Sequence, residues 1–473
     1  MLVAHTTPHP VAVPTPAEGL AHPDPAWLAR RRWARAGLVY TTLLVLSILF
    51  MGPLLFATLS SLKDQPTEWP PRLDPPQLSP RYWVGAYRLG KEGGGSGWFG
   101  SFEPGSTLRM ELTYRVPPGQ AEAPIGVQVP RRVPGAGAGA VRTGPFASEV
   151  AAVSPVEVVR RVEQEDGVAL TFRFTVHNAS ADVAVDRVPL DVTIPRGYRL
   201  LEATLPPNRE ERRGQVHSWN NIAGGLIPYV FYNYHRVFSE NYSRSTGRNL
   251  FLTWIGNSFL LAALKVLATL AFASLAGYTL ARMDFPGKQA LFVFMLFSMM
   301  LPPQVIFISN YLVLRDGIFG LSRLWGGGSL LNTFTGLVVS GLVGASAVFI
   351  MRQFFLSLPR ELEESARIDG ATPWQTFSRV ILPLARPALG ALTIMTFQGA
   401  WNDFFWPMVV LTAPQDKYTL TVGLLSFRRT YGVAFDWGPI LAGAVVSALP
   451  IVILFVIFQR YFIEGISFSG LKG

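Results

Sequence analysis

The sequence predicts an all-α polytopic membrane protein of six transmembrane helices, with an inserted β-rich domain on the extracytoplasmic side. Of its 473 residues, 49% are hydrophobic and only 15% are charged, whereas soluble domains carry about 25% charged residues. Six stretches stay apolar over the roughly 20 residues that a helix needs to cross a bilayer. Between the first and second stretches, apolar and polar residues alternate, which is typical of half-buried strands.

The six apolar stretches are Gly37–Leu62, Phe251–Ala281, Gln289–Leu314, Thr333–Phe354, Pro387–Leu411 and Pro439–Tyr461. The first follows a cluster of arginines and is too long for a signal-peptide core, so we expect it to be retained, with residues 1–36 as a cytoplasmic tail. Six crossings then place both termini in the cytoplasm. Basic residues are more numerous in the short loops that this topology places inside than in those outside, which agrees with the positive-inside rule.

Residues 37–90 comprise the first span and the start of an extracytoplasmic loop, and residues 91–225 are the inserted domain. Every second residue is apolar in Leu108–Val116, and the same alternation recurs in Leu170–Val176 and Leu190–Ile194. A segment of about 135 residues suffices for one small β domain. We therefore expect a separate, sandwich-like fold outside the membrane.

Composition and motifs argue against an enzyme and against nucleic-acid binding. The net charge is +10, but arginines that flank apolar stretches are typical of membrane proteins. Cysteine is absent and all six histidines lie outside the expected spans, so no metal site is expected. No Gly-x4-Gly-Lys-Ser/Thr loop is present to hold a nucleotide phosphate. We therefore expect this chain to bind no cofactor.

Residues 358–383 form a polar loop between the fourth and fifth stretches, on the cytoplasmic side of the expected topology. Pro359 suits the first position of a helix, and Gly370 offers the left-handed conformation that ends one. Thr372 and Gln375 have the spacing of a capping box, so a second helix should begin at once. The sequence therefore predicts a rigid elbow of helix, glycine turn and helix.

The first helix of this elbow is expected to have two faces. The residues expected to dock on apolar surface are Leu358, Leu362 and Ala366. The charged residues expected to point elsewhere are Arg360, Glu364 and Arg367. Two further acids, Glu361 and Glu363, lie in the first turn, where the positive end of the helix dipole favours them.

The loop resembles the signature of binding-protein-dependent ABC importer permeases, which is Glu-Ala-Ala, three residues, Gly, nine residues, Ile, one residue and Leu-Pro. The matching positions here are Glu364-Ser365-Ala366, Gly370, Val380 and Leu382-Pro383, with Ser for the first Ala and Val for Ile. In that family the loop fits a groove of the ATPase subunit. The residues that the resemblance assigns to this coupling are Glu364, Ala366, Arg367, Asp369, Gly370, Leu382 and Pro383.

Short segments that flank the loop, such as Gly399-Ala400-Trp401-Asn402-Asp403-Phe404, are similar to the corresponding segments of the MalG-like subunits of maltose-type carbohydrate importers. The resemblance covers the first span and residues 226–473, which it identifies as the permease domain in the inner (plasma) membrane. It implies a sugar substrate, a second permease, two ATPase subunits that bind ATP and Mg, and an extracytoplasmic solute-binding protein. It also implies that Tyr431, in the loop Thr412–Trp437, faces that binding protein.

Three polar residues fall within the expected spans. Lys265 lies near the centre of the second, where an ammonium group is costly, so it either faces a cavity or a subunit interface or extends its side chain towards water. Asn402 and Asp403 lie in the fifth span and would pair across the bundle, contact solute or make a structural hydrogen bond.

Two other classes of protein compete with this interpretation. A secondary transporter would show internal repeats and several buried carboxylates, but Asp403 is the one such residue identified. A membrane sensor that uses the β domain to bind a ligand would leave the elbow without a role. Both alternatives would work without an ATPase.

Overall fold

The computed structural model describes residues 25–63, 75–131, 146–211, 214–243, 245–317, 328–430 and 437–467. Contacts divide the chain into two units, Met1–Phe56 and Ala57–Gly473. Helix α1 (Pro25–Leu62) supplies the described part of the first unit and begins within the predicted cytoplasmic tail. Apolar side chains such as Phe50 are exposed along α1, which suits a helix surrounded by lipid.

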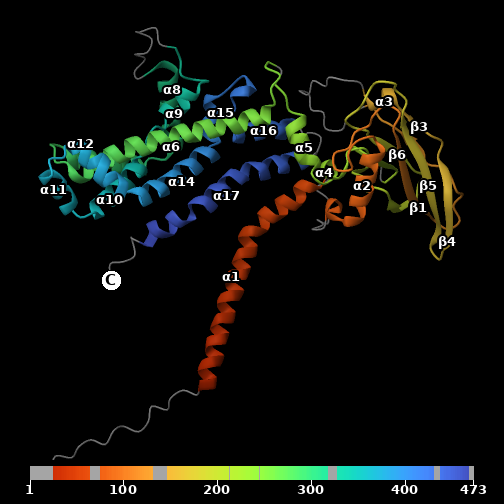
Figure 1. The fold of residues 1–473 in the computed structure, drawn as a ribbon, viewed down its shortest axis with the longest axis horizontal. Helices are drawn as coiled ribbons and strands as arrows, with labels where there is room; N and C mark the ends of the chain where they lie inside the picture. The colour runs from red at the N-terminus through yellow and green to blue at the C-terminus, as the bar shows by residue number, and fades with distance from the viewer. Residues whose placement is uncertain are drawn as a thin grey trace, which may run out of the picture. The chain divides into compact units, whose positions relative to one another are not determined.

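Between α1 and the next long helix, the chain forms two antiparallel sheets (Figure 1). The first has the order β3-β5-β1-β7, with β4 also paired to β5, and the second has the order β2-β6-β9-β8. The strands are β1 (Thr107–Val116), β2 (Gly126–Gln128), β3 (Ala151–Val153), β4 (Glu157–Gln164), β5 (Gly167–Asn178), β6 (Leu190–Thr193), β7 (Arg199–Ala203), β8 (Arg209–Glu211) and β9 (Val216–Trp219). A short helix, α3 (Ala147–Val150), precedes β3.

The two sheets share one apolar core. The alternation expected for β1 is observed, because every second residue from Leu108 to Val116 is buried. Leu112 lies opposite Phe172 of β5, and both join a cluster that includes Trp219 of the second sheet. Leu89 of α2 (Pro80–Glu92) belongs to the same cluster. The packed β region therefore begins before residue 91, the expected boundary.

Strand β4 differs from the others because all eight of its residues are exposed. It pairs with the first half of β5 through the turn that precedes Gly167, and the pairing register shifts between Val158 and Arg160. Within the described residues β4 pairs with no other strand. It therefore forms an exposed edge strand beside β5, whose own residues Leu170 and Phe172 belong to the core.

The remaining chain is helical. Its first elements are α4 (Leu226–Val230), α5 (Tyr232–Ser239), α6 (Leu250–Arg282), α7 (Lys288–Met300), α8 (Pro303–Asp316), α9 (Phe334–Val339) and α10 (Ala345–Ser357). They are followed by α11 (Glu361–Ile368), α12 (Pro373–Gln375), a π-helical turn (Thr376–Ile381), α13 (Leu382–Leu384), α14 (Arg386–Asn402), α15 (Phe405–Val410), α16 (Leu420–Thr430) and α17 (Gly438–Ser467). Helix α6 packs against α10 and α14, and α14 packs against α17.

Three of the expected spans are interrupted. The stretch expected over 289–314 bends by 108° between α7 and α8, where Pro302 lacks an N–H for the helix ladder. The stretch over 333–354 breaks between α9 and α10, a segment that contains Gly341 and Gly344. The stretch over 387–411 breaks at Asp403.

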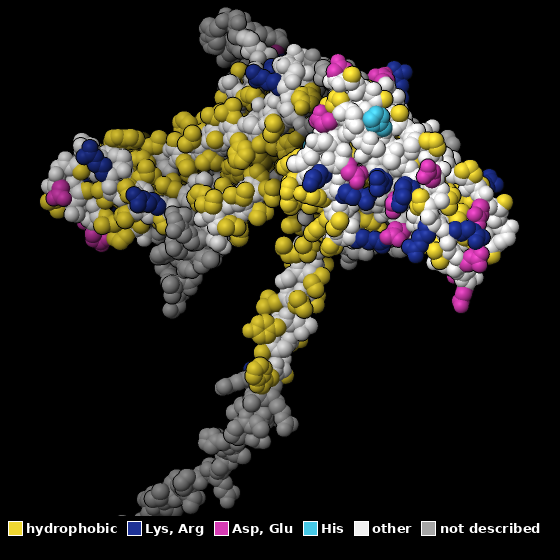
Figure 2. Space-filling model, turned by 45° about the vertical axis from the view of Figure 1, so that its right-hand side comes forward, with side chains coloured by type: hydrophobic (Ala, Val, Ile, Leu, Met, Phe, Trp, Pro, Cys, Tyr) yellow, Lys and Arg dark blue, Asp and Glu magenta, His cyan; other side chains and the backbone are white. Residues whose placement is uncertain are grey.

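In the described part of the chain, three helices are long and apolar enough to cross a membrane: Trp33–Leu62, Leu250–Arg282 and Gly438–Gln459. Two bent helix pairs raise the count to at most five, and Ala345–Ser357 is a shorter apolar helix. The count of six spans therefore stays a prediction. The face of the helical region shown in Figure 2 is largely apolar, whereas charged side chains gather over the β region, as expected if lipid surrounds the helices.

Candidate functional site

The elbow between α10 and α14 has the local structure that its sequence predicts. After α11, Gly370 adopts φ 80°. The N–H of Ala371 donates to the carbonyl of Ala366 at 2.9 Å, and the N–H of Gly370 donates to the carbonyl of Arg367 at 3.0 Å. This pair of bonds is the Schellman motif, which satisfies the last carbonyls of a helix.

The second helix of the elbow begins with the expected capping box. The Gln375 N–H donates to Thr372 Oγ1 at 3.3 Å, and the Thr372 N–H donates to Gln375 Oε1 at 2.8 Å. Both ends of the turn are thus fixed by hydrogen bonds within the elbow, which gives it a defined shape before any partner binds.

The docked face of α11 differs from the prediction in two respects. The helix begins at Glu361, two residues after Pro359, and Leu362 is 37% exposed instead of docked. The buried residues of α11 are Glu363 and Ala366. An acidic side chain occupies the inward face because a basic partner lies beneath it.

That partner is Arg282, the last residue of α6. Its Nε lies 3.3 Å from Glu363 Oε1, and the two side chains are only 4% and 8% exposed. Its Nη2 donates to the carbonyls of Phe355 and Leu358, at 2.6 and 2.5 Å. One guanidinium therefore joins α11 to the C-terminal ends of α6 and α10, where the negative helix dipoles favour a cation. No local sequence pattern predicts this role for Arg282.

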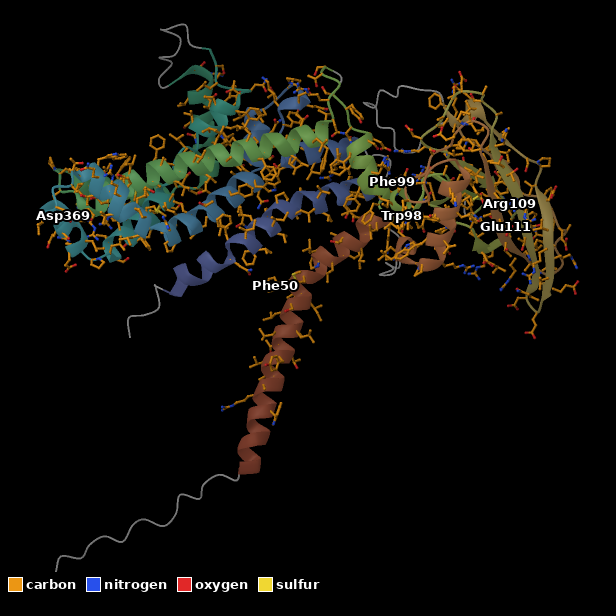
Figure 3. The ribbon with its side chains drawn as sticks, viewed as in Figure 1. Phe50, Trp98, Phe99, Arg109, Glu111 and Asp369 are labelled. Carbon is orange, nitrogen blue, oxygen red and sulfur yellow. The ribbon has the colours of Figure 1, made fainter. Side chains whose placement is uncertain are left out.

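The coupling residues implied by the sequence divide between the surface and the interior. Glu364, Arg367, Asp369 and Gly370 are exposed, and Asp369 lies at the end of the helical region in Figure 3. Ala366 is buried, and Leu382 and Pro383 are half-buried. Two exposed apolar side chains on the elbow were not predicted. They are Ile368, at 86% exposed, and Trp374, at 63%.

Lys265 and Asp403 come together in the helical region. Lys265 Nζ of α6 lies 3.7 Å from Asp403 Oδ2, in the break between α14 and α15. The Asp403 carboxylate also accepts a hydrogen bond from the N–H of Trp406 at 3.3 Å, and its carbonyl accepts one from Thr421 at 2.7 Å. The structure therefore shows Asp403 both paired across the bundle and in a structural hydrogen bond. Asn402 is exposed and takes no part in this pair.

The break between α9 and α10 lies beside the same lysine. A β-carbon at Gly341 would lie 3.6 Å from Lys265 Nζ, and Trp406 Nε1 donates to Ser340 Oγ at 2.6 Å. Interrupted helices within a membrane occur where the backbone is buried in protein or lines a cavity. Two such interruptions therefore meet around one ammonium group.

Comparisons with known proteins identify the family. The model of the binding-protein-dependent transport system inner membrane component matches residues 270–467, which include the elbow and Asp403. The arabinooligosaccharides transport system permease protein AraQ of Halalkalibacterium halodurans is 39% identical over 48% of this chain and 77% of its own length. The maltose/maltodextrin transport system permease protein MalG of Vibrio vulnificus is 35% identical over 47% of this chain and 73% of its own. The chain belongs to this family of ABC importer permeases.

The resemblance drawn from the elbow is thereby confirmed, and the permease is a transport component instead of an enzyme. Among solved structures, a bacterial ABC transporter that imports alginate matches with a TM-score of 0.39 and 24% identity, over 49% of this chain and 79% of that one. This likeness is too low to add to the family assignment.

The loop between α15 and α16 of the permease is held by Asp416. Its carboxylate accepts hydrogen bonds from the hydroxyls of Ser243, Ser245 and Thr246, at 2.8, 3.0 and 2.6 Å. Burial raises the pKa of Asp416, but these hydrogen bonds outweigh it and hold the pKa below its usual value. Tyr431, expected to face a binding protein, lies outside the described residues.

Proposed function

We propose that this permease imports a sugar of the oligosaccharide class. Relatives that are 34 to 39% identical to this chain are named for arabinooligosaccharides, maltose or maltodextrin, and diacetylchitobiose. ATP would be hydrolysed by partner subunits. Two such ATPase subunits would bind ATP and Mg.

The elbow is the observation that carries this proposal. Its tip presents charged and apolar side chains together, which suits a protein groove. Its base is tied to α6 and α10 through the buried Arg282–Glu363 pair. If an ATPase moves the tip of the elbow, α6 and α10 would therefore move with it, because the ion pair restricts the movement of α11 relative to these two helices.

The rest of the assembly follows from the same proposal. A second permease would complete the pathway, and a solute-binding protein would meet the extracytoplasmic face, including the loop 412–437. The permease would lie in the inner membrane as a multi-pass protein with both termini in the cytoplasm. The β region would then project on the extracytoplasmic side, since it follows the first span.

Lys265 and Asp403 would line the pathway or its interface with the second permease. The pair is partly exposed and lies where two helices are interrupted, which is the arrangement that transporters use at substrate sites. A sugar offers hydroxyl groups that can replace the weak contact between the two charges. Asn402, on the exposed side, would face the partner or the solute.

Reconstitution tests the proposal. The permease would be purified with its ATPase, partner permease and binding protein, and sugar-stimulated ATP hydrolysis and uptake would be measured in proteoliposomes. Glu364→Lys reverses a charge on the exposed tip without touching the core, so it should weaken ATPase docking and lower both activities. Full ATP-dependent uptake with Glu364→Lys would contradict coupling through this loop. Uptake that persists without any ATPase would contradict the whole assignment.

A further inference from the structure

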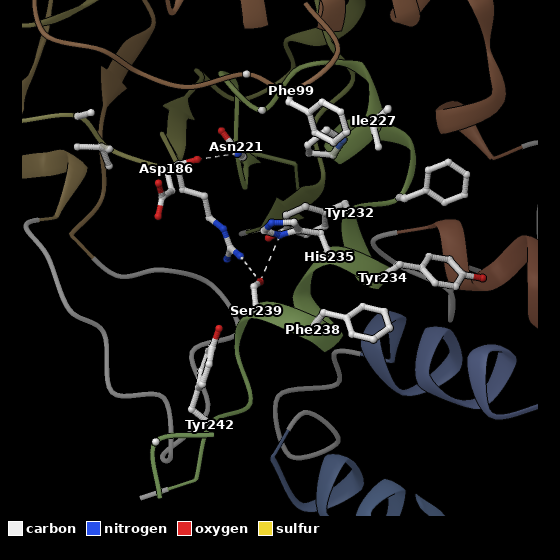
Figure 4. A pocket seen from close by; sticks show the side chains of 18 of the residues that line it. Phe99, Asp186, Asn221, Ile227, Tyr232, Tyr234, His235, Phe238, Ser239 and Tyr242 are labelled. Atoms are coloured by element: carbon white, nitrogen blue, oxygen red, sulfur yellow. Dashed lines mark hydrogen bonds between the residues drawn. The ribbon is translucent and has the colours of Figure 1, made fainter. Parts of the chain in front are cut away.

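A large pocket lies outside the long helices, between loops of the β region and the α4–α5 segment. Its volume is about 1060 Å³, at the upper end of the range of small-molecule sites. Loop residues such as Phe99, Asp186 and Asn221 form one wall, and residues of α5 and the following loop form the other (Figure 4). The family model does not extend to either wall.

The α5 wall presents a stripe of rings. His235 and Phe238 are three residues apart in α5, which is the spacing of one helix face. Phe231, the N-cap of α5, and Tyr242, beyond its C-terminal end, lie on either side of them in the sequence, and all four residues line the pocket and are exposed. Phe99 belongs to the opposite wall and is 61% exposed. Such rings offer flat apolar faces to a ligand.

The stripe is held in place from behind. Phe238 packs edge-to-face against buried Phe251, with ring centroids 5.2 Å apart. His235 Nδ1 shares a hydrogen bond with Ser239 Oγ at 3.2 Å. A pocket whose rings are already fixed loses little entropy when a ligand binds.

The opposite wall is fixed by Asn221. Its Nδ2 donates to the carbonyl of Asp186 at 3.3 Å, and its Oδ1 accepts the N–H groups of Val188 and Ala223, at 3.3 and 3.0 Å. These bonds hold the loop that carries Asp186, an exposed residue that lines the pocket. Carboxylate oxygens are strong acceptors for hydroxyl groups.

Charged residues in and next to the pocket wall compensate one another. Arg187 Nη1 lies 2.7 Å from Glu240 Oε1, and Arg236 Nε lies 3.1 Å from the same oxygen. Asp186 adds a second negative charge near Arg187. Partial desolvation at the pocket wall and the neighbouring Arg187 lower the pKa of His235, which favours the neutral form of its ring. The pocket therefore has no excess charge with which to select an anion or a cation.

This combination restricts the chemistry of the ligand. A purely apolar ligand would remove water from the exposed, charged Asp186 without replacing its hydrogen bonds, which is costly. A strongly charged ligand would find no uncompensated counter-charge. A neutral sugar can contact both walls, because its apolar C–H faces can stack on the aromatic rings and its hydroxyl groups can donate hydrogen bonds to Asp186.

We propose that this pocket binds a short, uncharged oligosaccharide outside the translocation pathway. Its volume leaves room for more than one sugar ring. Binding of a saccharide is inferred from the residues that line the pocket. The further idea that the pocket holds the transported sugar rests on the proposed function. The pocket would then concentrate the sugar at the extracytoplasmic face.

Binding of maltotriose to the full chain in lipid nanodiscs, measured by calorimetry, tests the inference. Phe99→Ala removes one exposed ring and should weaken binding about tenfold or more. Trp98→Ala is the matched control, because Trp98 is a neighbouring exposed ring that does not line the pocket, and it should change the affinity less than twofold. Asp186→Asn should also weaken binding, since a neutral amide is a poorer acceptor.

The outcomes separate this inference from the proposed function. Glu364→Lys, on the elbow and not among the residues that line the pocket, should leave maltotriose binding unchanged even where uptake is lost. No binding of maltotriose, cellotriose or chitotriose would overturn the inference while ATP-dependent sugar uptake could still stand. Equal affinity of Phe99→Ala and the unchanged chain would place the sugar elsewhere and would also overturn it.

Discussion

Replacing Arg282 by methionine is the sharpest test of how the elbow is attached to the helices. The substitution keeps a long apolar side chain but removes the guanidinium that serves Glu363 and the carbonyls of Phe355 and Leu358. Glu363 would remain buried without its cation. Only local attachment should change, because α6 keeps its apolar packing against α10 and α14.

The expected magnitude follows from the burial of the pair. Removing one partner of a buried ion pair costs about 3–5 kcal/mol, and the lower value applies here since Glu363 can reach water once α11 detaches. About 3 kcal/mol corresponds to roughly a 100-fold larger population of the detached elbow. The double variant Arg282→Met with Glu363→Leu should recover most of this loss, because an apolar pair can replace a buried ion pair at little cost.

Hydrogen–deuterium exchange of the permease in nanodiscs measures this population. Amides of α11 should exchange up to about 100-fold faster in Arg282→Met, while those in the middle of α6 stay protected. Arg367→Met is the matched control, since it removes an arginine from the exposed side of the same helix. If α11 exchanges at the same rate in both variants, the buried pair does not hold the elbow and the reasoning fails.

Three further predictions concern other parts of the chain. Gly370→Val should lower sugar-stimulated ATP hydrolysis, because valine at this positive φ costs about 1–2 kcal/mol. No atom lies within 4 Å of a β-carbon there, so this cost arises from the backbone conformation alone. Asparagine tolerates the conformation, so Gly370→Asn should retain most of the activity, and equal losses in the two variants would contradict the argument. Lys265→Met leaves Asp403 without its cation and should reduce uptake at least tenfold at normal membrane abundance, whereas unchanged uptake would make Lys265 a bystander. Because the pKa of Asp416 is depressed in the folded protein, its hydrogen bonds stabilise the loop above the usual carboxyl pKa of about 4, and this stability is lost as pH falls through the lower folded pKa. Hydrogen–deuterium exchange of the backbone amides at Ser243, Ser245 and Thr246, corrected for its intrinsic pH dependence, should therefore rise on acidification. Asp416→Asn should abolish that rise.

Local signals account for what the sequence predicted well. The capping box of Thr372 and the turn at Gly370 depend on a few neighbouring residues, so they can be recognised without knowing the fold. The strand alternation of β1 is equally local, because its buried face is set by every second residue. The family signature then implies the coupling role proposed for the elbow.

Tertiary pairing accounts for what the sequence missed. Glu363 turns inward because Arg282 lies beneath it. The two residues are far apart in the chain, so no local sequence pattern predicts that they form a pair. Helix breaks were missed for a related reason, since hydropathy averages over Gly341 and Asp403 and reports a continuous apolar run. Pro302 was a visible signal for one break, because proline removes a helix hydrogen bond.

The exposed hairpin strand β4 has a consequence for how copies of this protein coexist. An open strand edge invites pairing with the same edge of a neighbouring chain, and membrane proteins meet repeatedly in two dimensions. Charged residues of both signs interrupt this edge, namely Glu157, Arg160, Arg161 and Glu163, and the register shift after Val158 bends it. Both features disfavour strand addition, so the hairpin can remain uncovered at high surface density without acting as a seed for aggregation.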